Sequence, residues 1–176
     1  MKIAGKVVII TGAGSGIGRT LAVECAKKNA KIILVGRREN KLKETLNEIE
    51  NEKGEGAIYR VDVTDQTQIK QMVDNVISHF GHIDILYNNA GSFSAIGPLW
   101  EIDPDQWWRD VEVNLRGIML CSNAVLPHMI KRDTGIIINA SGGGAGFPNP
   151  GGSGYSCSKA AILRLTDTLA QELKKI

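Results

Sequence analysis

The sequence has little of what builds disulfides, metal centres or membrane spans. Its three cysteines, Cys25, Cys121 and Cys157, are widely spaced and form no CxxC pair. That pattern is typical of free thiols in a reducing cytosol. No apolar run approaches the ~20 residues that cross a membrane, and the first residues have no signal-peptide layout. We therefore expect a cytoplasmic protein that does not bind membranes.

An excess of charge of one sign is also missing. The chain carries 21 Lys and Arg against 19 Asp and Glu, a formal net charge of +2. This balance argues against nucleic acid as a partner. The histidines, His79, His82 and His128, show no metal-ligand grouping, so no metal site is predicted. With 176 residues, 43% of them hydrophobic, the chain has the size of one domain with a substantial core.

Two kinds of apolar segment alternate along the chain. Short runs rich in Val and Ile are typical of strands buried on both faces, and they are Val7–Ile10, Ile32–Val35, Ile58–Val61, Ile83–Tyr87 and Ile136–Asn139. Longer segments with helical spacing are Asn40–Lys53, Gln66–Phe80 (with Asp65 as its N-cap), Asp105–Lys131 and Tyr155 to the end. The alternation predicts an α/β fold of βαβ units with a parallel sheet, whose last strand is left as an open edge.

A glycine cluster, TGAGSGIG at positions 11–18, follows the first predicted strand and opens a helix. Glycine permits a tight turn and lets the backbone approach a bulky anion, and the helix N-terminus directs N–H groups and a positive dipole end at that anion. No GK[ST] follows, which excludes a P-loop, and Ile17 breaks the usual GxGxxG spacing. The position in an α/β chain still favours a dinucleotide pyrophosphate over a plain structural turn.

The end of the second predicted strand reads ILVGRREN. An acidic residue at this point binds the ribose 2′-hydroxyl of NAD, whereas an arginine accepts the 2′-phosphate of NADP. Gly36 stands where the acid is expected, and Arg37 and Arg38 follow. A guanidinium fork suits a phosphate, so NADP is the predicted cofactor and NAD the less favoured one. The alternative is a solvated basic loop in which Arg38 pairs with a neighbour such as Glu39.

Together with these features, several further motifs resemble the short-chain dehydrogenase/reductase family. They are VDV at 61–63, NNAG at 88–91, VNLRG at 113–117, Ser141 after the fifth predicted strand and YSCSK at 155–159, in the family's order along nearly the whole chain. The resemblance implies one Rossmann-type domain over residues 1–176, a doubly wound parallel sheet in three α/β/α layers. It also implies oxidoreductase activity with NADP(H) on a small carbonyl or alcohol substrate.

The resemblance also implies roles for individual residues. The pyrophosphate side of the cofactor would be held by Gly12, Ser15, Gly16, Ile17 and Gly18. The adenine would contact Asp62 and Val63, and the cofactor cleft would be lined by Asn89, Ala90 and Gly91. Catalysis would rest on Tyr155 as acid/base, with Lys159, Asn114 and Ser141 assisting; Lys159 would also bind the nicotinamide ribose, and Asn114 would help to hold a water that relays protons to it.

Tyr155 and Lys159 stand four residues apart, so both side chains lie on one face of a helix. A tyrosine hydroxyl is ordinarily a weak acid, and a lysine ammonium beside it favours the phenolate. Such a tyrosine can donate a proton to a carbonyl oxygen or take one from an alcohol, while a nicotinamide carries the hydride.

Two departures from the family pattern bear on activity. The serine usually stands three residues after the strand asparagine, here Asn139, and that position is Gly142. A one-residue slip turns a side chain to the opposite face, so either a bulge near Gly142–Gly144 brings Ser141 into place or the serine role is vacant. Ser141 is the predicted residue, and Ser153 is a distant alternative. The chain also ends where family members continue with further strands, so we expect an incomplete domain that lacks the last strands.

The resemblance further implies a homo-oligomer, a dimer or tetramer formed through the helices on either side of the fifth strand. A second hypothesis stays open beside the enzyme: a catalytically inactive dinucleotide-binding protein that acts as a sensor or interaction partner. The displaced serine and the missing strands motivate it.

Overall fold

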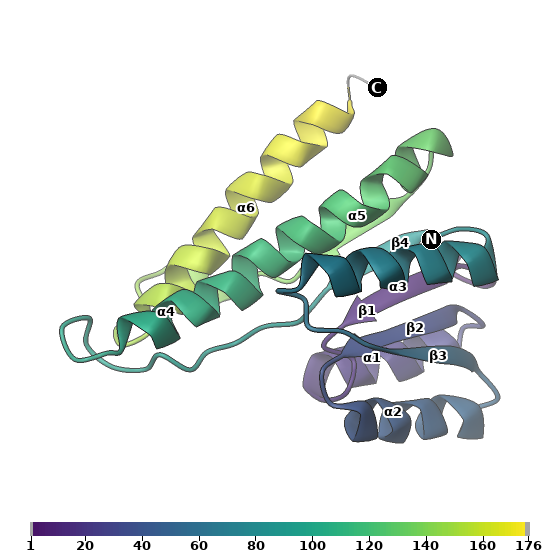
Figure 1. Cartoon of the computed structure of the whole chain (residues 1–176), viewed down its shortest axis with the longest axis horizontal. Coiled ribbons are helices and arrows are strands. Elements are labelled where there is room, and N and C mark those ends of the chain that lie inside the picture. Colours follow the sequence, from purple (N-terminus) through teal and green to yellow (C-terminus); the bar gives the residue numbers. More distant parts are fainter. Residues whose placement is uncertain (1, 175–176) are drawn as a thin grey trace.

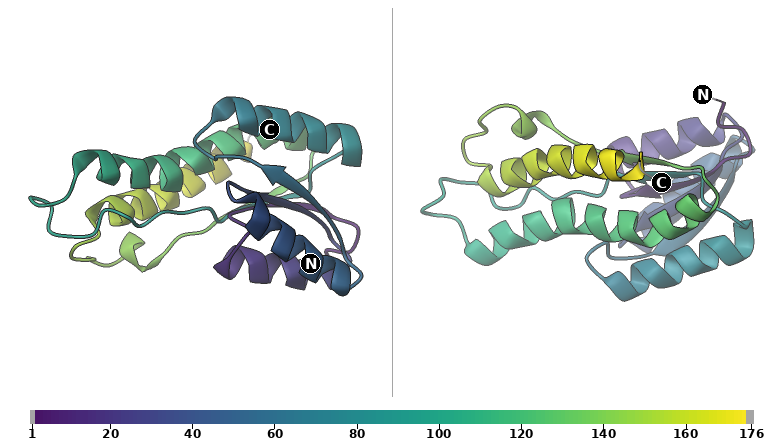
Figure 2. Two further views of the ribbon diagram at one scale, coloured as in Figure 1. Left: turned by 60° about the horizontal axis from the view of Figure 1, so that its bottom comes forward. Right: turned by 90° about the horizontal axis from the view of Figure 1, so that it is seen from above.

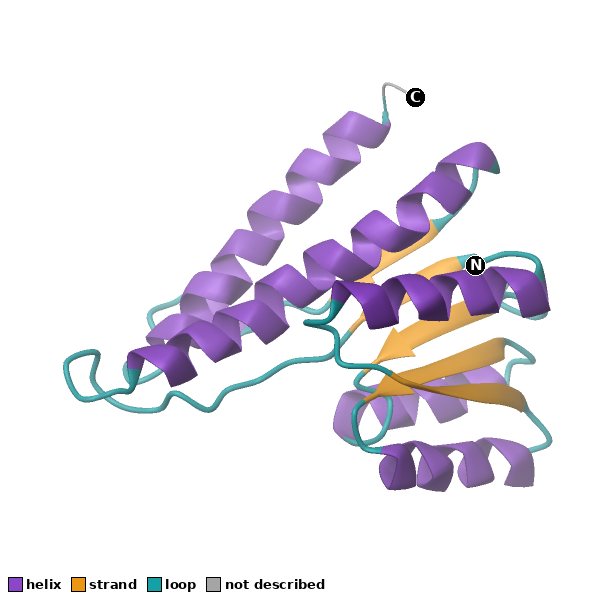
Figure 3. Ribbon diagram, in the orientation of Figure 1, coloured by secondary structure: helices purple, strands orange, loops and turns teal. Residues whose placement is uncertain are grey.

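The computed structural model describes residues 2–174 and contains a five-stranded parallel sheet (Figures 1 and 3). The strands are β1 (Val7–Thr11), β2 (Lys31–Gly36), β3 (Glu55–Arg60), β4 (Ile85–Asn88) and β5 (Ile136–Asn139). They lie in the order β3-β2-β1-β4-β5. The order reverses between β1 and β4, and in open α/β sheets ligands bind at that point, outside the carboxyl ends of the strands.

Helices cover both faces of the sheet, as the sequence predicted. They are α1 (Gly16–Ala26), α2 (Glu39–Asn51), α3 (Gln66–Phe80), α4 (Pro104–Val111), α5 (Gly117–Lys131) and α6 (Ser153–Leu173). Alternate residues of each strand feed two separate cores. Val8 and Ile10 pack with α1 and α2, whereas Val7 and Ile9 pack with α3 and α5. Figure 2 shows the three layers that result.

Some element boundaries differ from the sequence prediction. The strand β3 begins earlier, at Glu55, because the backbone of 55–57 pairs with β2 although its residues are not a continuous apolar run. The strand β4 begins later, at Ile85, because Asp84 turns its carboxylate toward the start of β1. The predicted N-cap is confirmed: the Asp65 side chain accepts hydrogen bonds from the N–H groups of Thr67 and Gln68. Residues 175 and 176 of the predicted last helix lie outside the described residues.

One long helix was expected over Asp105–Lys131, and the structure divides it. A π-helical turn, Glu112–Arg116, joins α4 to α5. The predicted site residue Asn114 lies inside this turn and is fully buried. π turns are rare and are found often at functional sites. The helix α4 packs against α6, and α5 packs against α3.

The strand β5 forms an edge of the sheet in the described chain, as predicted. Its side chains Ile136 and Ile138 are 39% and 42% exposed. A groove of about 300 Å³ runs beside it between α5 and α6, lined mainly by apolar side chains.

A buried carboxylate joins β1 to β4 at their amino ends. Asp84 accepts hydrogen bonds from the Val7 N–H at 2.9 Å and from Lys6 Nζ at 3.1 Å, and His82 and Arg132 lie within ion-pair distance. Burial by itself raises the pKa of Asp84, but the hydrogen bonds from Val7 and Lys6 and the charge of His82 hold it below the ordinary value. The ionised form therefore stabilises the fold.

We predict that Asp84→Asn lowers the free energy of unfolding by about 2 kcal/mol at neutral pH, because its cationic and N–H partners lose a buried anion. The contribution of Asp84 is complete above the ordinary carboxyl range near pH ~4 and is lost as the pH falls through its lowered folded-state value. Urea unfolding of both forms at several pH values measures this. Asp74→Asn, at an exposed carboxylate, is the control. Equal stability of the Asp84 variant and wild type at neutral pH would contradict the assignment.

Candidate active site

The glycine-rich turn is locked to the end of β4. The Thr11 hydroxyl accepts hydrogen bonds from the N–H groups of Asn89 and Ala90, at 2.9 and 3.0 Å. The Asn89 amide donates to the carbonyl of Thr11 at 3.0 Å and reaches that of Gly12 at 3.5 Å. Thr11 is 1% exposed. Thr11 belongs to the glycine-rich motif, but no role was predicted for it. Its position as a hydroxyl residue at the end of a buried strand could have indicated this contact.

Two of the predicted glycines are required by this close contact. Gly12 has φ +68°, and a Cβ there would lie 3.0 Å from the backbone of Ala90. A Cβ on Gly18 would lie 2.5 Å from both Asn89 Nδ2 and the Gly12 carbonyl oxygen. Gly18 is therefore buried behind the turn, where it lets α1 approach. Gly16 and Ile17 lie on the solvent side, and Ile17 is 72% exposed.

A cavity of about 240 Å³ opens at the carboxyl ends of β1, β2 and β4. Most residues predicted to bind the cofactor line it: Gly12, Ser15, Arg37, Arg38, Asp62, Val63, Asn89, Ala90 and Gly91. The Ser15 side chain at the N-cap of α1 makes no capping hydrogen bond among the described residues, so the first N–H groups of the helix stay available to an anion. A backbone-lined cavity with free N–H groups and a basic wall fits the phosphates of a dinucleotide.

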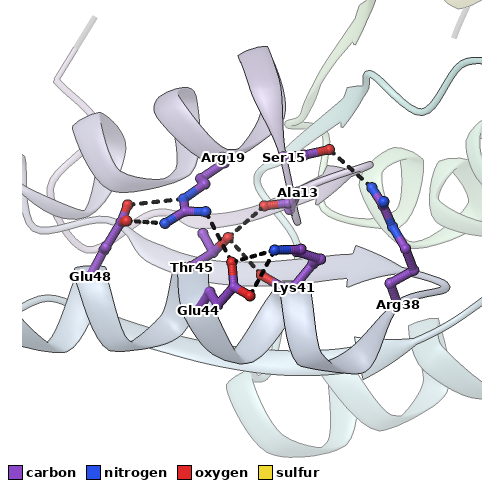
Figure 4. A network of polar contacts seen from close by, with 8 residues as sticks. All are labelled: Ala13, Ser15, Arg19, Arg38, Lys41, Glu44, Thr45 and Glu48. Atoms are coloured by element: carbon purple, nitrogen blue, oxygen red, sulfur yellow. Dashed lines mark hydrogen bonds and ion pairs between the residues drawn. The ribbon is translucent and has the colours of Figure 1, made fainter.

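The basic wall is formed by the residues that follow β2. Arg37 and Arg38 are exposed, and the Arg38 guanidinium donates to the Ser15 hydroxyl at 3.2 Å (Figure 4). Among residues 2–174, neither arginine forms an ion pair with a carboxylate. Glu39, the partner considered for Arg38, pairs with Lys43 instead. Within this part of the chain, neither guanidinium is therefore held in an ion pair, although the charge of Arg37 acts on the nearby Asp62 carboxylate.

Asp62 also lines the cavity, just after β3, and is held by its own loop. Its carboxylate accepts hydrogen bonds from the N–H and the hydroxyl of Thr64, at 3.0 and 2.8 Å, and from Arg109 at 3.2 Å. Burial by itself raises the pKa of Asp62, but the Thr64 hydrogen bonds and the charge of Arg109 bring it below the ordinary value. The carboxylate is thus ionised and fixed at the edge of the cavity.

Asn114 fixes the segment that follows the NNAG motif. Its amide donates to the Ser92 carbonyl at 2.7 Å and accepts from the Ser92 N–H at 2.8 Å. Asp110, one helical turn earlier and fully buried, accepts from Ser92, Ser94 and Ala95. These contacts occupy the Asn114 side chain, so it positions the wall of the cleft. Asp110 was not predicted to be a site residue, because a carboxylate on a helix gives no local sign of burial.

Tyr155 and Lys159 lie near the start of α6, on one face, as the spacing predicts. Lys159 is 4% exposed, its Nζ donates to the Ala140 carbonyl at 2.7 Å, and Nζ lies 5.5 Å from the centroid of the Tyr155 ring. Burial lowers the pKa of Lys159. The Phe93 ring packs against Tyr155 with a centroid distance of 4.9 Å. The pair thus combines a half-buried hydroxyl with a cation that releases its proton more readily than a surface lysine.

The structure does not bring Ser141 to the tyrosine. Gly142 has an extended backbone, φ −170° and ψ 170°, and a Cβ there would collide with the Tyr155 hydroxyl. Neighbouring side chains in an extended segment point to opposite sides. Ser141 is accordingly exposed, and none of the hydrogen bonds among the described residues uses its hydroxyl. The bulge that would present Ser141 is not seen, and Gly142 occupies the facing position.

Ser153, the distant alternative, has a packing contact instead. Its hydroxyl accepts a hydrogen bond from Trp107 Nε1 at 3.0 Å, which joins α6 to α4. Cys157, between the tyrosine and the lysine, is exposed. Cys121 is buried, and burial raises the pKa of its thiol to about 12, so that thiol stays protonated.

Comparison with known proteins places this site in a family. The family-level sequence pattern described as short chain dehydrogenase matches residues 6–176. The chain belongs to the short chain dehydrogenase family. A curated relative of this family, a short chain dehydrogenase of Pseudocercospora fijiensis, is 39% identical over 98% of the chain. The chain spans 56% of the length of that relative.

Solved structures of short chain dehydrogenases and related oxidoreductases share the fold closely. An NAD⁺-bound xylitol dehydrogenase has a TM-score of 0.96 at 32% identity, with 99% of this chain and 67% of the other covered. A metagenomic short-chain oxidoreductase in complex with NADP has a TM-score of 0.94 at 31% identity, with 99% and 79% covered. These likenesses confirm the predicted Rossmann-type architecture and the predicted family.

Two further findings concern the described part of the chain. No helix within residues 2–174 has the length and apolar character to cross a membrane. In the same residues, no three His, Cys, Asp or Glu side chains gather as metal ligands do.

We predict that Ser141→Ala lowers kcat/KM by less than about threefold, because removing a hydroxyl that faces solvent removes no interaction made in the transition state. Steady-state kinetics on a carbonyl substrate measure the change, and Ser78→Ala, at an exposed serine on α3, is the control. A loss of about a hundredfold or more in Ser141→Ala alone would show that the glycine loop moves and that Ser141 serves the reaction after all.

Proposed function

We propose that this short chain dehydrogenase transfers a hydride between NADP(H) and a small carbonyl or alcohol substrate. The observation that carries the proposal is the Tyr155–Lys159 pair on one face of α6, with the lysine buried and held to the Ala140 carbonyl. The pair follows β5 at the same end of the sheet as the backbone-lined cavity. Proton transfer and dinucleotide binding are therefore available on one side of the molecule.

In the proposed reaction Tyr155 moves the proton at the substrate oxygen. Its hydroxyl donates to the oxygen of a carbonyl during reduction and accepts from an alcohol during oxidation. Lys159, whose pKa is lowered by burial, supports the phenolate and releases its proton readily. Asn114 and Asp110 hold the Ser92–Ala95 segment in place beside them. A bound nicotinamide supplies or accepts the hydride.

The proposed preference for NADP rests on the residues after β2. The NAD⁺-bound and NADP-bound relatives are almost equally similar to this chain. No acidic residue stands at the end of β2; the cavity there is lined by Gly36, Arg37 and Arg38. Two guanidinium groups without a carboxylate partner favour a 2′-phosphate and offer no acceptor to a ribose 2′-hydroxyl. We also propose a cytoplasmic homo-oligomer, in line with the family resemblance.

A second candidate function is dinucleotide binding without catalysis, as a sensor or interaction protein. Gly142 favours it, because the residue that faces the Tyr155 hydroxyl has no side chain to donate a hydrogen bond to the substrate oxygen. The two candidates differ in one property: both bind NADPH, and only the first couples its oxidation to reduction of a carbonyl.

For the enzyme, we expect Tyr155→Phe to reduce turnover by at least about a thousandfold, because the acid/base hydroxyl is lost. The dissociation constant for NADPH should change by less than about threefold, because Lys159 and the cavity remain. NADPH oxidation with a panel of ketones and aldehydes, and fluorescence titration of NADPH, give the two values. Cys157→Ala, on the exposed side of α6, is the control. Turnover retained by the Phe variant would exclude Tyr155 as the acid/base.

For the cofactor, we expect the wild-type chain to bind NADPH at least about tenfold more tightly than NADH, since guanidinium–phosphate contacts are charge-assisted. Arg37→Ala should remove most of this preference by weakening NADPH alone. Calorimetric titration with each cofactor measures it. Arg164→Ala, at a side chain that is 83% exposed on α6, is the control. Equal affinity of the wild type for both cofactors would refute the NADP assignment.

A further inference from the structure

A third basic residue, Lys41 in the first turn of α2, also lines the cavity. Lys41 lines it together with Arg37 and Arg38. The Cβ of Lys41 packs against the glycine-rich turn, since a Cβ added to Gly14 would lie 2.9 Å from it. Lys41 therefore stands where the turn, the end of β2 and α2 meet. The sequence motifs did not point to Lys41.

Lys41 differs from the two arginines because its ammonium group already forms an ion pair with a carboxylate. The Lys41 Nζ donates to both carboxylate oxygens of Glu44, at 2.8 and 2.9 Å (Figure 4). Glu44 is also within 3.3 Å of Arg19, whose main partner is Glu48. The Lys41 contact is the first cause that keeps the pKa of Glu44 below its ordinary value. Glu44 is thus an anion that holds the ammonium of Lys41, a residue that lines the proposed phosphate site.

We propose that Lys41 is a third ligand for the 2′-phosphate of NADP and that Glu44 competes with that phosphate for it. The inference rests on the proposed function and deepens it. Glu44 acts as an internal anion, so the strength of the NADP preference is set by the Lys41–Glu44 pair as well as by Arg37 and Arg38. A dianionic phosphate draws the ammonium away from Glu44, whereas a ribose 2′-hydroxyl leaves the pair intact.

The attachment of α2 to the glycine-rich turn does not depend on Glu44. The Thr45 hydroxyl, which is fully buried, donates to the Ala13 carbonyl at 3.0 Å. Arg19 keeps its contacts with Glu48. Replacing Glu44 by glutamine therefore changes the charge beside Lys41 and leaves the position of the helix unchanged.

The experiment is calorimetric titration of the full chain with 2′,5′-ADP and with 5′-AMP at low ionic strength. These probes differ by the 2′-phosphate and need no turnover. We expect Lys41→Met to weaken 2′,5′-ADP by about fivefold and Glu44→Gln to strengthen it by about threefold, magnitudes typical of partly exposed charge pairs. Neither variant should change the affinity for 5′-AMP by more than about 1.5-fold, because the pair does not contact the shared part of the probes.

Two controls separate this effect from general charge and from helix stability. Glu50→Gln removes the same charge from an exposed position of the same helix and leaves the Lys41–Glu44 pair, and Lys43→Met removes a lysine that pairs with Glu39. Neither should alter the ratio of the two affinities. An increase in Glu50→Gln equal to that in Glu44→Gln would overturn the specific role of Glu44.

The outcomes also separate this inference from the cofactor assignment on which it rests. If the wild type prefers 2′,5′-ADP and Arg37→Ala lowers that preference, but Lys41→Met and Glu44→Gln leave it unchanged, the inference is overturned and the NADP assignment stands. If the wild type binds both probes equally and Arg37→Ala has no effect, the NADP assignment and the inference fail together.

Discussion

The hydrogen bonds between Thr11 and the backbone of Asn89 and Ala90 join the carboxyl ends of β1 and β4, where the strand order of the sheet reverses. Two parts of the candidate site, the glycine-rich turn and the cleft wall after β4, are attached to this junction. The glycine turn leaves it from β1, the cleft wall leaves it from β4, and the Asn89 side chain closes the space between them. The contact needs a buried hydroxyl at one strand end and glycines at 12 and 18, because a Cβ at either glycine would separate the two segments.

The alternation of apolar runs was enough to predict the parallel sheet, its two helical layers and the edge position of β5. Strands buried on both faces produce continuous apolar runs, and this signal is local. The apolar pattern could not predict that β3 starts at Glu55, because the first residues that pair with β2 have no apolar pattern. The π turn could not be predicted either, since the apolar spacing over Asp105–Lys131 does not distinguish one long helix from two helices joined by a wider turn.

The parts of the site that depend on the spacing and order of sequence motifs could be predicted. Tyr155 and Lys159 share a helix face because of their spacing, and the residues around the cavity follow strand ends that must meet. The placement of Ser141 depended on the backbone conformation of one glycine, which sequence spacing does not determine. Asp110 and Lys41 owe their surroundings to segments distant in sequence, Ser92–Ala95 and Gly14, so no local pattern could indicate them.

The π turn at Glu112–Arg116 also changes the phase of the helix, that is, the direction in which successive side chains point, between α4 and α5. A π turn closes its hydrogen bond one residue later than an α turn, and each residue of a helix advances the side chains by ~100°. The inward stripe of α4 therefore meets α6, while that of α5 meets α3 and the sheet. The joined helices α4 and α5 thus serve two layers of the molecule, and the buried Asn114 lies at the point where the phase shifts. Asn114 and Asp110 at this junction hold the Ser92–Ala95 segment, whose Phe93 ring packs against Tyr155, so the junction between the two layers also fixes the segment that borders the tyrosine.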